Sequence, residues 1–236
     1  MILRAGFDGS PERLGGTIAS AYALNQEVCP VRSIRPYRRS DRDQLYDICV
    51  RTASAGDDMT GVYSRDDLMP DLYTGPYCDL EPELAFVLDE GGTAVGYIIA
   101  TADTRAFVER WRDEWLPAFA ERHPLTPDVT EAEKNQILRG LHPEQMLIPE
   151  VDEYPAHLHI DLLPQARGFG HGRALLQTLR SALAASGVMR MHLSMDPANR
   201  TRARSTIASD FIHCLPADRM PPSWESQRAD ERLGAA

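Results

Sequence analysis

Cysteine is scarce in this chain of 236 residues and never falls in closely spaced pairs. Cys29, Cys49, Cys78 and Cys214 are scattered, and no C-x-x-C spacing occurs. Structural zinc sites of the finger type and disulfide frameworks both depend on clustered cysteines, so neither is predicted. We expect a reduced, cytoplasmic protein that holds no metal.

Long apolar runs and an excess of basic residues are also missing. No window reaches the roughly 18 apolar residues of a membrane span, and the first eight residues lack the apolar core of a signal peptide. The formal net charge is -10 at pH 7. Such a charge argues against nonspecific binding of nucleic acid or anionic lipid and would attract a basic acceptor. Neither a membrane nor a nucleic acid is expected as a partner.

A glycine-rich turn stands out against this background. It runs from Gln165 to Arg173 with glycines at Gly168, Gly170 and Gly172, between an apolar run at 157–163 and a helix-like run at 174–185. A strand that enters a helix through such a turn leaves several backbone N–H groups unpaired and pointing the same way. The turn therefore predicts a pyrophosphate site. The alternative is an ordinary tight connection without a ligand.

The spacing of the glycines narrows the ligand. The dinucleotide pattern G-x-G-x-x-G and the Lys-Ser/Thr phosphate loop are both absent, and the turn reads Q-x-x-G-x-G. This pattern resembles the acetyl-CoA-binding motif of the GNAT acetyltransferases. Residues 156–164, 173–176 and 189–195 resemble the fourth strand, the following helix and the fifth strand of that family. Residues 74–77, 100–103 and 155–164 resemble bacterial acetyltransferases related to the C-terminal acetyltransferase-like (pseudo-HAT) domain of O-GlcNAcase.

The resemblance implies a fold and a domain plan. The expected fold is the α/β GNAT (acyl-CoA N-acyltransferase) fold, a mixed and mostly antiparallel splayed sheet with helices on both faces. Residues 1–30 are expected to form a flexible extension, 31–215 the acetyltransferase domain with a helical insertion at 103–155, and 216–236 an irregular tail. Residues 84–88 and 94–101, which flank Gly91-Gly92, predict a β-hairpin.

The same resemblance implies acetyl-CoA as acyl donor and an amine, either a small molecule or a protein lysine, as acceptor. A homodimer is also expected, because many members of the family pair. The strand end would hold the pantetheine arm and the thioester, and the N–H groups of the turn would hold the pyrophosphate, with support from the guanidinium of Arg167. The implied acetyl-CoA-binding residues are Leu162, Leu163, Gln165, Arg167, Gly168, Phe169, Gly170, His171, Gly172, Arg173 and Asn199.

His157, His159 and Asp161 alternate along the predicted fourth strand and should project from one face. A zinc site is one interpretation, but the sequence offers no further ligands in a recognisable motif. A second interpretation makes His159 or Asp161 the general base, acting directly or through a water molecule. The third is a hydrogen-bonded polar row without a catalytic role.

One departure from the family pattern concerns the general acid. GNAT members commonly carry a tyrosine in a helix after the asparagine, and Ile207 stands at or near that position here. An alkyl side chain donates no proton, so Tyr154, Ser205 or water would have to protonate the leaving thiolate. The alternative function is therefore a catalytically weak or inactive CoA-binding pseudo-acetyltransferase that acts as an interaction module.

Two further groups of residues lie outside the turn and the predicted fourth strand. Trp111, Trp115 and Phe119 recur at helical spacing, which favours a core-facing stripe over a ligand cage. The region 52–80 is rich in Gly, Asp, Tyr and Pro, as expected of loops and short helical turns beside a pocket. Its acceptor-side candidates, for which solvated loop side chains are the alternative, are Asp57, Asp58, Tyr63, Tyr73 and Tyr77.

Overall fold

The computed structural model describes residues 31–54, 56–194 and 212–215. All of them belong to one compact unit that begins at Val31. The predicted N-terminal extension and C-terminal tail lie outside the described residues, and the domain boundaries stay predictions. No helix in the described part of the chain combines the length and the apolar content that crossing a bilayer would require.

Six strands of the described chain form one sheet in which spatial order follows chain order. The first four strands pair antiparallel, whereas β5 adds to β4 and β6 to β5 in parallel. This confirms the expected mixed, mostly antiparallel sheet. The strands are β1 (Arg32–Pro36), β2 (Phe86–Glu90), β3 (Thr93–Thr101), β4 (Ala156–Leu162), β5 (Met191–Ser194) and β6 (Ile212–Leu215).

The predicted hairpin is present as β2 and β3. Its turn is closed by Gly91 and Gly92, whose φ angles of 63° and 96° lie where side chains other than glycine are disfavoured. The N–H of Gly92 also donates to Oδ1 of Asp89 over 2.7 Å.

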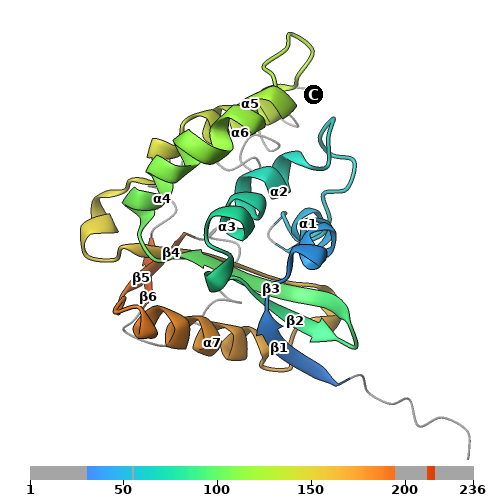
Figure 1. The fold of residues 1–236 in the computed structure, drawn as a ribbon. Helices are drawn as coiled ribbons and strands as arrows, with labels where there is room; N and C mark the ends of the chain where they lie inside the picture. The colour runs from blue at the N-terminus through green and yellow to red at the C-terminus, as the bar shows by residue number, and fades with distance from the viewer. Residues whose placement is uncertain (1–30, 55, 195–211, 216–236) are drawn as a thin grey trace, which may run out of the picture. The chain divides into compact units, whose positions relative to one another are not determined.

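Helices cover both faces of the sheet, as expected (Figure 1). On one face lie α1 (Arg42–Val50), α2 (Leu68–Tyr73) and α3 (Gly75–Leu80), and on the other lies α7 (His171–Ala185). Between β3 and β4 the chain forms α4 (Thr104–Arg110), a π-helical turn η3 (Trp111–Trp115), α5 (Leu116–Arg122) and α6 (Glu131–Leu141). Short 3-10 turns are η1 (Arg39–Asp41), η2 (Pro82–Leu84), η4 (Pro143–Met146), η5 (Pro149–Asp152) and η6 (Pro164–Ala166).

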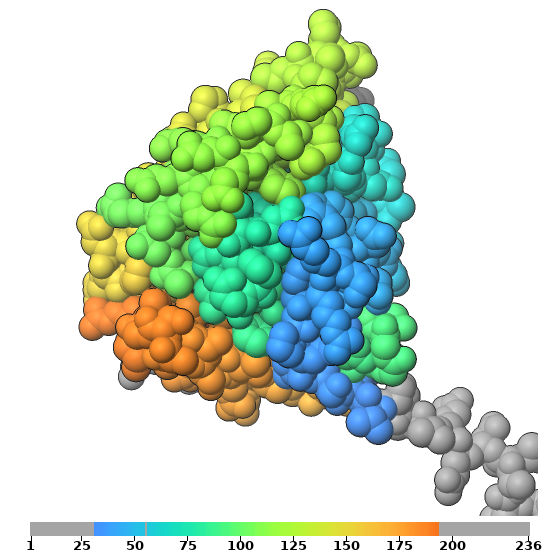
Figure 2. Space-filling view, in the orientation of Figure 1, coloured from blue at the N-terminus to red at the C-terminus, as the bar shows by residue number. Residues whose placement is uncertain are grey.

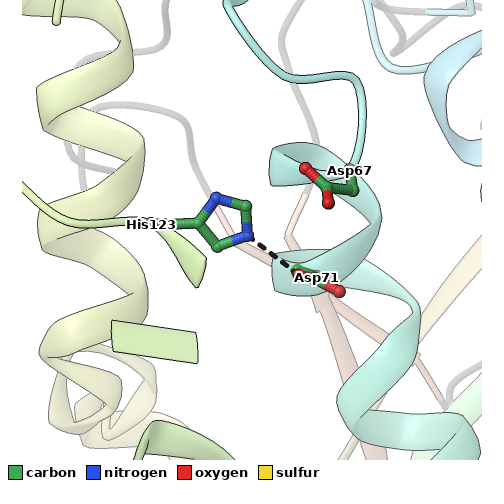
Figure 3. A group of neighbouring side chains, drawn as sticks. All are labelled: Asp67, Asp71 and His123. Carbon is green, nitrogen blue, oxygen red and sulfur yellow. Dashed lines mark hydrogen bonds and ion pairs between the residues drawn. The ribbon is translucent and has the colours of Figure 1, made fainter. Parts of the chain in front are cut away.

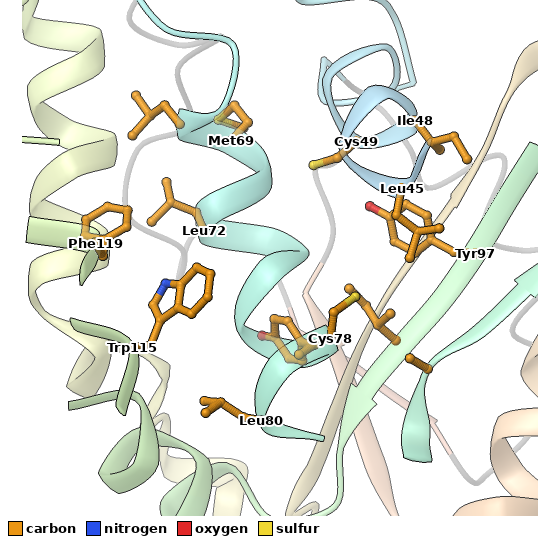
Figure 4. Close-up of a cluster of buried hydrophobic side chains, with 14 of the residues drawn as sticks. Leu45, Ile48, Cys49, Met69, Leu72, Cys78, Leu80, Tyr97, Trp115 and Phe119 are labelled. Atoms are coloured by element: carbon orange, nitrogen blue, oxygen red, sulfur yellow. The ribbon is translucent and has the colours of Figure 1, made fainter. Parts of the chain in front are cut away.

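The helices between β3 and β4 add a further layer to one face. Figure 2 shows this segment packed against the region of α2 and α3, with α7 on the opposite side of the molecule. The predicted aromatic stripe lies in the contact, because Trp111, Trp115 and Phe119 are 3%, 5% and 0% exposed. Figure 4 shows Trp115 and Phe119 beside Leu72 of α2. The interpretation of the stripe as core is therefore confirmed.

Alternation along the strands creates two separate cores. Tyr97 and Ile99 of β3 face the core with α1, α2 and α3, whereas Ile98 and Leu158 face the core with α7. In the β3–β4 ladder, Tyr97, Ile99 and Thr101 are opposite Asp161, His159 and His157. Residues directly opposite in a ladder share a face. The two histidines and the aspartate thus point together toward the α1–α3 side, as the sequence predicted.

Candidate active site

The sheet opens between β4 and β5. Along β3, β4 is paired from Thr101↔His157 to Gly96↔Leu162, but along β5 it is paired at Ala156 and His157 alone. In the described residues, no strand covers the β5-facing edge of β4 beyond His157. An uncovered strand edge offers backbone N–H and C=O groups to an extended ligand that lies alongside.

The glycine-rich turn lies at the far end of this open edge. Gly168 and Gly170 have φ angles of 84° and 82°. A Cβ atom at either position would meet nothing within 4 Å. Backbone conformation therefore requires glycine at both positions, and the space beside their Cα atoms is open in the described part of the chain.

Helix α7 begins directly at this turn. Gly170 is its N-cap and supplies no side-chain cap, and the bond from Ala174 N to Gly170 O, 3.1 Å, closes the first helical turn. The N–H groups of His171 and Gly172 precede that bond and have no acceptor within the helix. With the positive end of the dipole of a 15-residue helix, they form a site that favours an anion.

Arg167 braces this region instead of pointing freely into it. Its guanidinium donates to the carbonyl of Leu162 and, across the fold, to the carbonyl of Gly56, each over 2.8 Å. Leu163 is also engaged, since its N–H donates to Val95 O over 3.0 Å and its carbonyl accepts from Ala166 N over 2.8 Å. The predicted contacts of Arg167, Leu162 and Leu163 with acetyl-CoA stay predictions, now with these protein partners in place.

The other predicted ligand residues are spread around the turn. Gln165 is exposed, and Phe169 is 69% exposed with the guanidinium of Arg32 5.4 Å from its ring centroid. The ring of His171 lies 6.1 Å from that of Phe169. Asn199, Ser205 and Ile207 lie outside the described residues. The contact of Asn199 with acetyl-CoA and the replacement of the family tyrosine by Ile207 stay predictions from the sequence.

A hydrogen-bonded relay joins the two predicted histidines. The hydroxyl of Tyr77 in α3 lies 2.6 Å from Nε2 of His157 and 3.0 Å from Nε2 of His159. The other ring nitrogen of His157, Nδ1, lies 2.8 Å from Oγ1 of Thr104. Burial lowers the pKa of His159 to about 4 and holds the pKa of His157 well below its usual range, with help from the neighbouring rings. Both imidazoles are therefore neutral near pH 7.

Asp161, the third member of the row, belongs to a separate network. Its Oδ2 accepts from the hydroxyl of Tyr97 over 2.6 Å, and that hydroxyl lies 3.0 Å from Oγ1 of Thr74. Burial raises the pKa of Asp161, although the hydrogen bond from Tyr97 and the charge of Arg167 act in the opposite direction. A carboxyl in these surroundings is a better proton acceptor than an exposed one.

Tyr154 lies at the opposite end of β4, two residues before the strand begins. Its carbonyl accepts from Nδ1 of His192 over 2.8 Å, and the guanidinium of Arg190 lies 5.8 Å from its ring centroid. Asp161 is five steps along the chain from Ala156, where β4 begins, which is about 17 Å at roughly 3.3 Å per step. The structure therefore does not bring Tyr154 together with Asp161, and its role as general acid stays a prediction.

The acceptor-side candidates divide into two groups. The rings of Tyr73 and Tyr77 lie 5.5 Å and 5.0 Å from the ring of His159, so these tyrosines converge on the site. Asp57 and Asp58 are exposed, and Asp58 accepts from the N–H and hydroxyl of Thr60. Tyr63 is buried.

Two site residues were missed from the sequence, Thr104 and Tyr97. Thr104 begins α4, 53 residues before the histidine it contacts. Tyr97 stands within the apolar run of β3, where a tyrosine is usually read as core. A polar tip in that run, placed opposite the Asp161 of the next strand by the hairpin register, is the signal that could have found Tyr97.

The sequence also gave no sign of a cluster of polar side chains that lies apart from these residues. Its contacts are those of an ion-pair cluster. Asp67, Asp71 and His123 place candidate ligand atoms within 4.8 Å of one another (Figure 3). Oδ2 of the buried Asp71, however, already accepts from Nε2 of His123 and from Nε of Arg122, each over 2.8 Å, and its Oδ1 accepts from Tyr46. Although burial raises the pKa of Asp71, the hydrogen bonds from His123 and Tyr46 outweigh it and lower the pKa.

The chain was compared with family models, curated proteins and solved structures. No family model matches the sequence. Among solved structures, SsHAT is 50% identical in sequence, with a TM-score of 0.69, and the match covers 75% of this chain and 88% of that chain. A GNAT family acetyltransferase from Brucella melitensis in complex with acetyl-CoA gives 14% identity and a TM-score of 0.39, over 73% of this chain and 81% of that one.

The curated relatives confirm the narrower resemblance. Protein O-GlcNAcase of Rattus norvegicus and that of Mus musculus are each 28% identical to this chain over 164 residues. The match covers 66% of this chain and 17% of theirs, so the chain spans less than a fifth of the length of these relatives.

Proposed function

Since this chain belongs to the GNAT family of acetyltransferases, we propose that it transfers the acetyl group of acetyl-CoA to an amine. One observation carries the proposal. The open edge of β4 leads into a glycine turn that faces open space and begins α7. A strand edge suits the amide-containing pantetheine arm, and a helix N-terminus suits the pyrophosphate that follows it.

The reaction asks for positioning more than for strong acids and bases. An oriented thioester beside a neutral amine gains most of its rate from proximity and from N–H groups aimed at the oxyanion. In the proposal, backbone N–H groups of the open β4 edge donate hydrogen bonds to the oxyanion. A thiol of ordinary pKa, about 8.5, leaves as a thiolate without an obligatory acid. His159 and Asp161 are the proposed proton acceptors, and Tyr154 a proposed donor.

The acceptor is proposed to be a cationic amine, carried by a small molecule or by a protein lysine. The chain carries 35 acidic and 25 basic residues, which favours encounter with a positively charged partner. The tyrosines that converge on His159 supply amphipathic walls of a kind that suits an alkyl amine.

A matched pair of glycine variants tests the donor site. Gly170 and Gly187 flank the two ends of α7, have φ angles of 82° and 80°, and would each place a Cβ in open space. Gly170→Glu and Gly187→Glu therefore carry the same backbone strain. A negative charge at the helix N-terminus favours the helix itself, and Gly187→Glu shows how much binding is lost through backbone strain at an end of α7 alone.

Calorimetry with acetyl-CoA gives the readout. Gly170→Glu should weaken binding by at least about tenfold, because it crowds and repels the pyrophosphate, whereas Gly187→Glu should bind like the wild type. Equal affinity in all three proteins would refute the assigned site. Thiol release is then measured with a panel of amines and basic peptides. Tight binding without release across that panel would favour the CoA-binding interaction module over the enzyme.

A further inference from the structure

The direction of the hydrogen bonds in the histidine relay is determined by one backbone carbonyl. Pro155 O accepts from the N–H of Thr104 over 2.9 Å and from its hydroxyl over 2.7 Å. A carbonyl oxygen accepts and never donates, so the single hydroxyl hydrogen of Thr104 is used in this bond. Oγ1 of Thr104 can then act toward His157 only as an acceptor.

This assignment continues through His157. Since Oγ1 of Thr104 accepts, Nδ1 of His157 carries the hydrogen of the 2.8 Å contact between them. The ring is 8% exposed and neighbours the rings of His159 and His192, which disfavours a second proton. The neutral ring therefore has a bare Nε2, which accepts from the hydroxyl of Tyr77 over 2.6 Å.

Tyr77 also fixes the direction of the hydrogen bond to His159. Its hydroxyl hydrogen is now used toward His157, so its oxygen must accept in the 3.0 Å contact with His159. Nε2 of His159 is therefore the protonated nitrogen, and Nδ1 keeps its lone pair. Tyr77 is 1% exposed and stacks on Phe107 at 4.6 Å between ring centroids, so its hydroxyl has little freedom to turn away.

The lone pair of His159 is the open end of the relay. Nδ1 of His159 has no hydrogen-bond partner in the described ranges of the chain. The side chain is partly exposed, on the stretch of β4 that has separated from β5, and its ring makes an edge-type contact with the ring of Tyr73. Asp161 on the same strand is a second proton acceptor, and one of its oxygens already accepts from the hydroxyl of Tyr97.

We infer that Tyr77 is a positioning residue that holds His159 as the Nε2–H tautomer, so that Nδ1 accepts a hydrogen bond and then a proton from the acceptor amine. This rests on the proposed function. In the transfer, the acceptor first releases its ammonium proton to water. The neutral amine nitrogen then bonds to the carbonyl carbon of the thioester, the C–S bond breaks, and Nδ1 takes the second proton that the nitrogen loses. The imidazolium returns that proton to the CoA thiolate, directly or through water. The products are the acetamide and free CoA thiol.

The tautomer is measured without reference to activity. Long-range proton–nitrogen NMR on protein labelled with nitrogen-15 at histidine separates protonated from bare ring nitrogens, and His159→Gln assigns the signals. Wild-type protein should show His159 protonated at Nε2, and Tyr77→Phe should lose that fixed state. Tyr73→Phe is the matched control, because its hydroxyl bonds with Arg139 and Gln136 rather than with the ring it touches. It should leave the tautomer unchanged.

A second pair of variants avoids changing the buried tyrosine. Thr104→Val removes the acceptor of His157 and should shift His159 toward the Nδ1–H tautomer. Thr104→Ser keeps the hydroxyl and should restore the wild-type spectrum. This pair retains the test if Tyr77→Phe does not fold. Protonation of wild-type His159 at Nδ1 would overturn the inference. So would a His159 tautomer that is the same in wild type, Tyr77→Phe and Thr104→Val.

Kinetics separate the inference from the proposed function. With an amine that the wild type acetylates, Tyr77→Phe should lower kcat by about 10- to 100-fold and leave the KM for acetyl-CoA within about twofold. Unchanged kcat in a variant whose tautomer has shifted would also overturn the inference. Absence of turnover by the wild type would instead count against the proposed function, while the NMR result still decides whether Tyr77 sets the tautomer.

Discussion

The guanidinium of Arg167 donates to the carbonyl of Gly56, 111 residues earlier in the chain, over 2.8 Å. A second bond from the same side chain reaches Leu162 at the end of β4. One side chain thus holds the loop after α1, the open strand and the glycine turn in a common arrangement. A lysine cannot reproduce the two-pronged geometry, because its ammonium is a single point on a flexible stem.

Substitution of Arg167 separates bracing from charge. We expect Arg167→Lys and Arg167→Ala to lower the free energy of unfolding by a similar amount, about 1 to 3 kcal/mol, since both lose the paired carbonyl bonds. Urea denaturation measures this loss, and calorimetry with acetyl-CoA measures binding. If Arg167→Lys were as stable as wild type while Arg167→Ala was not, positive charge rather than bracing would be the role of this residue.

Gly140 is needed for the close approach of α6 and α5. A Cβ there would overlap the ring of Phe119, which is fully buried, and lie 2.8 Å from Cδ2 of Leu72. We expect Gly140→Ala to destabilise the protein by about 1 to 3 kcal/mol, although alanine is the better helix former by roughly 1 kcal/mol. Thermal or urea unfolding measures the change.

The exposed Asn135 in α6 provides the control for this substitution. Asn135→Ala changes helix propensity without a packing cost and should be neutral or slightly stabilising. A Gly140→Ala protein as stable as Asn135→Ala would show that the contact of the two helices tolerates a methyl group.

The stability of the folded protein should depend on the negative charge of Asp71. Asp71→Asn leaves Arg122 and His123 facing a neutral amide in a buried setting, and we expect a loss of about 3 kcal/mol. Asp67 pairs with Arg65, whose side chain is 55% exposed, so Asp67→Asn should cost at most about 1 kcal/mol. Urea unfolding of both variants is the measurement. Equal losses would mean that the three residues act as one unit, as metal ligands would.

His159 should make stability depend on pH. Its pKa is about 4 in the folded protein against an ordinary 6.5, so between these values the unfolded chain binds more protons. The contribution is present above pH 6.5 and is lost as the pH falls toward 4. From pH 7 to pH 5 this amounts to roughly 2 kcal/mol for one group. His157 acts in the same direction, and the raised pKa of Asp161 acts against it.

Comparison with His159→Gln isolates this term, because the other groups remain in both proteins. The glutamine amide can still donate to the hydroxyl of Tyr77. The variant should lose about 1 to 2 kcal/mol less than wild type between pH 7 and pH 5 in urea unfolding. Parallel pH profiles for the two proteins would contradict a depressed pKa at His159.

Much of the fold was accessible from local patterns. The hairpin followed from two apolar runs around Gly91 and Gly92, and the buried stripe followed from helical spacing of Trp111, Trp115 and Phe119. These features depend on backbone conformation and periodicity within a short window, which sequence records directly. The common face of His157, His159 and Asp161 followed in the same way from the two-residue period of a strand.

The contacts that give the site its chemistry were less accessible. The sequence offered His159 and Asp161 as equivalent candidates, and the difference between them comes from Tyr77, Tyr97 and Thr104, which approach from other elements. The sequence makes Tyr77 an acceptor-side candidate, but nothing local indicates that its hydroxyl lies between two histidines about 80 residues later in the chain. Such contacts depend on how the helices dock on the sheet.

The sequence by itself determined the turn at Gly168 and Gly170, the start of α7 and the alternation of β4, because each is a property of consecutive residues. Only the tertiary structure decided that β4 separates from β5 after His157 and that a carbonyl at Pro155 orients the hydrogen bonds that end at His159. Strand separation and hydrogen-bond direction arise where segments distant in the chain meet. No local pattern records which donors and acceptors will face each other there.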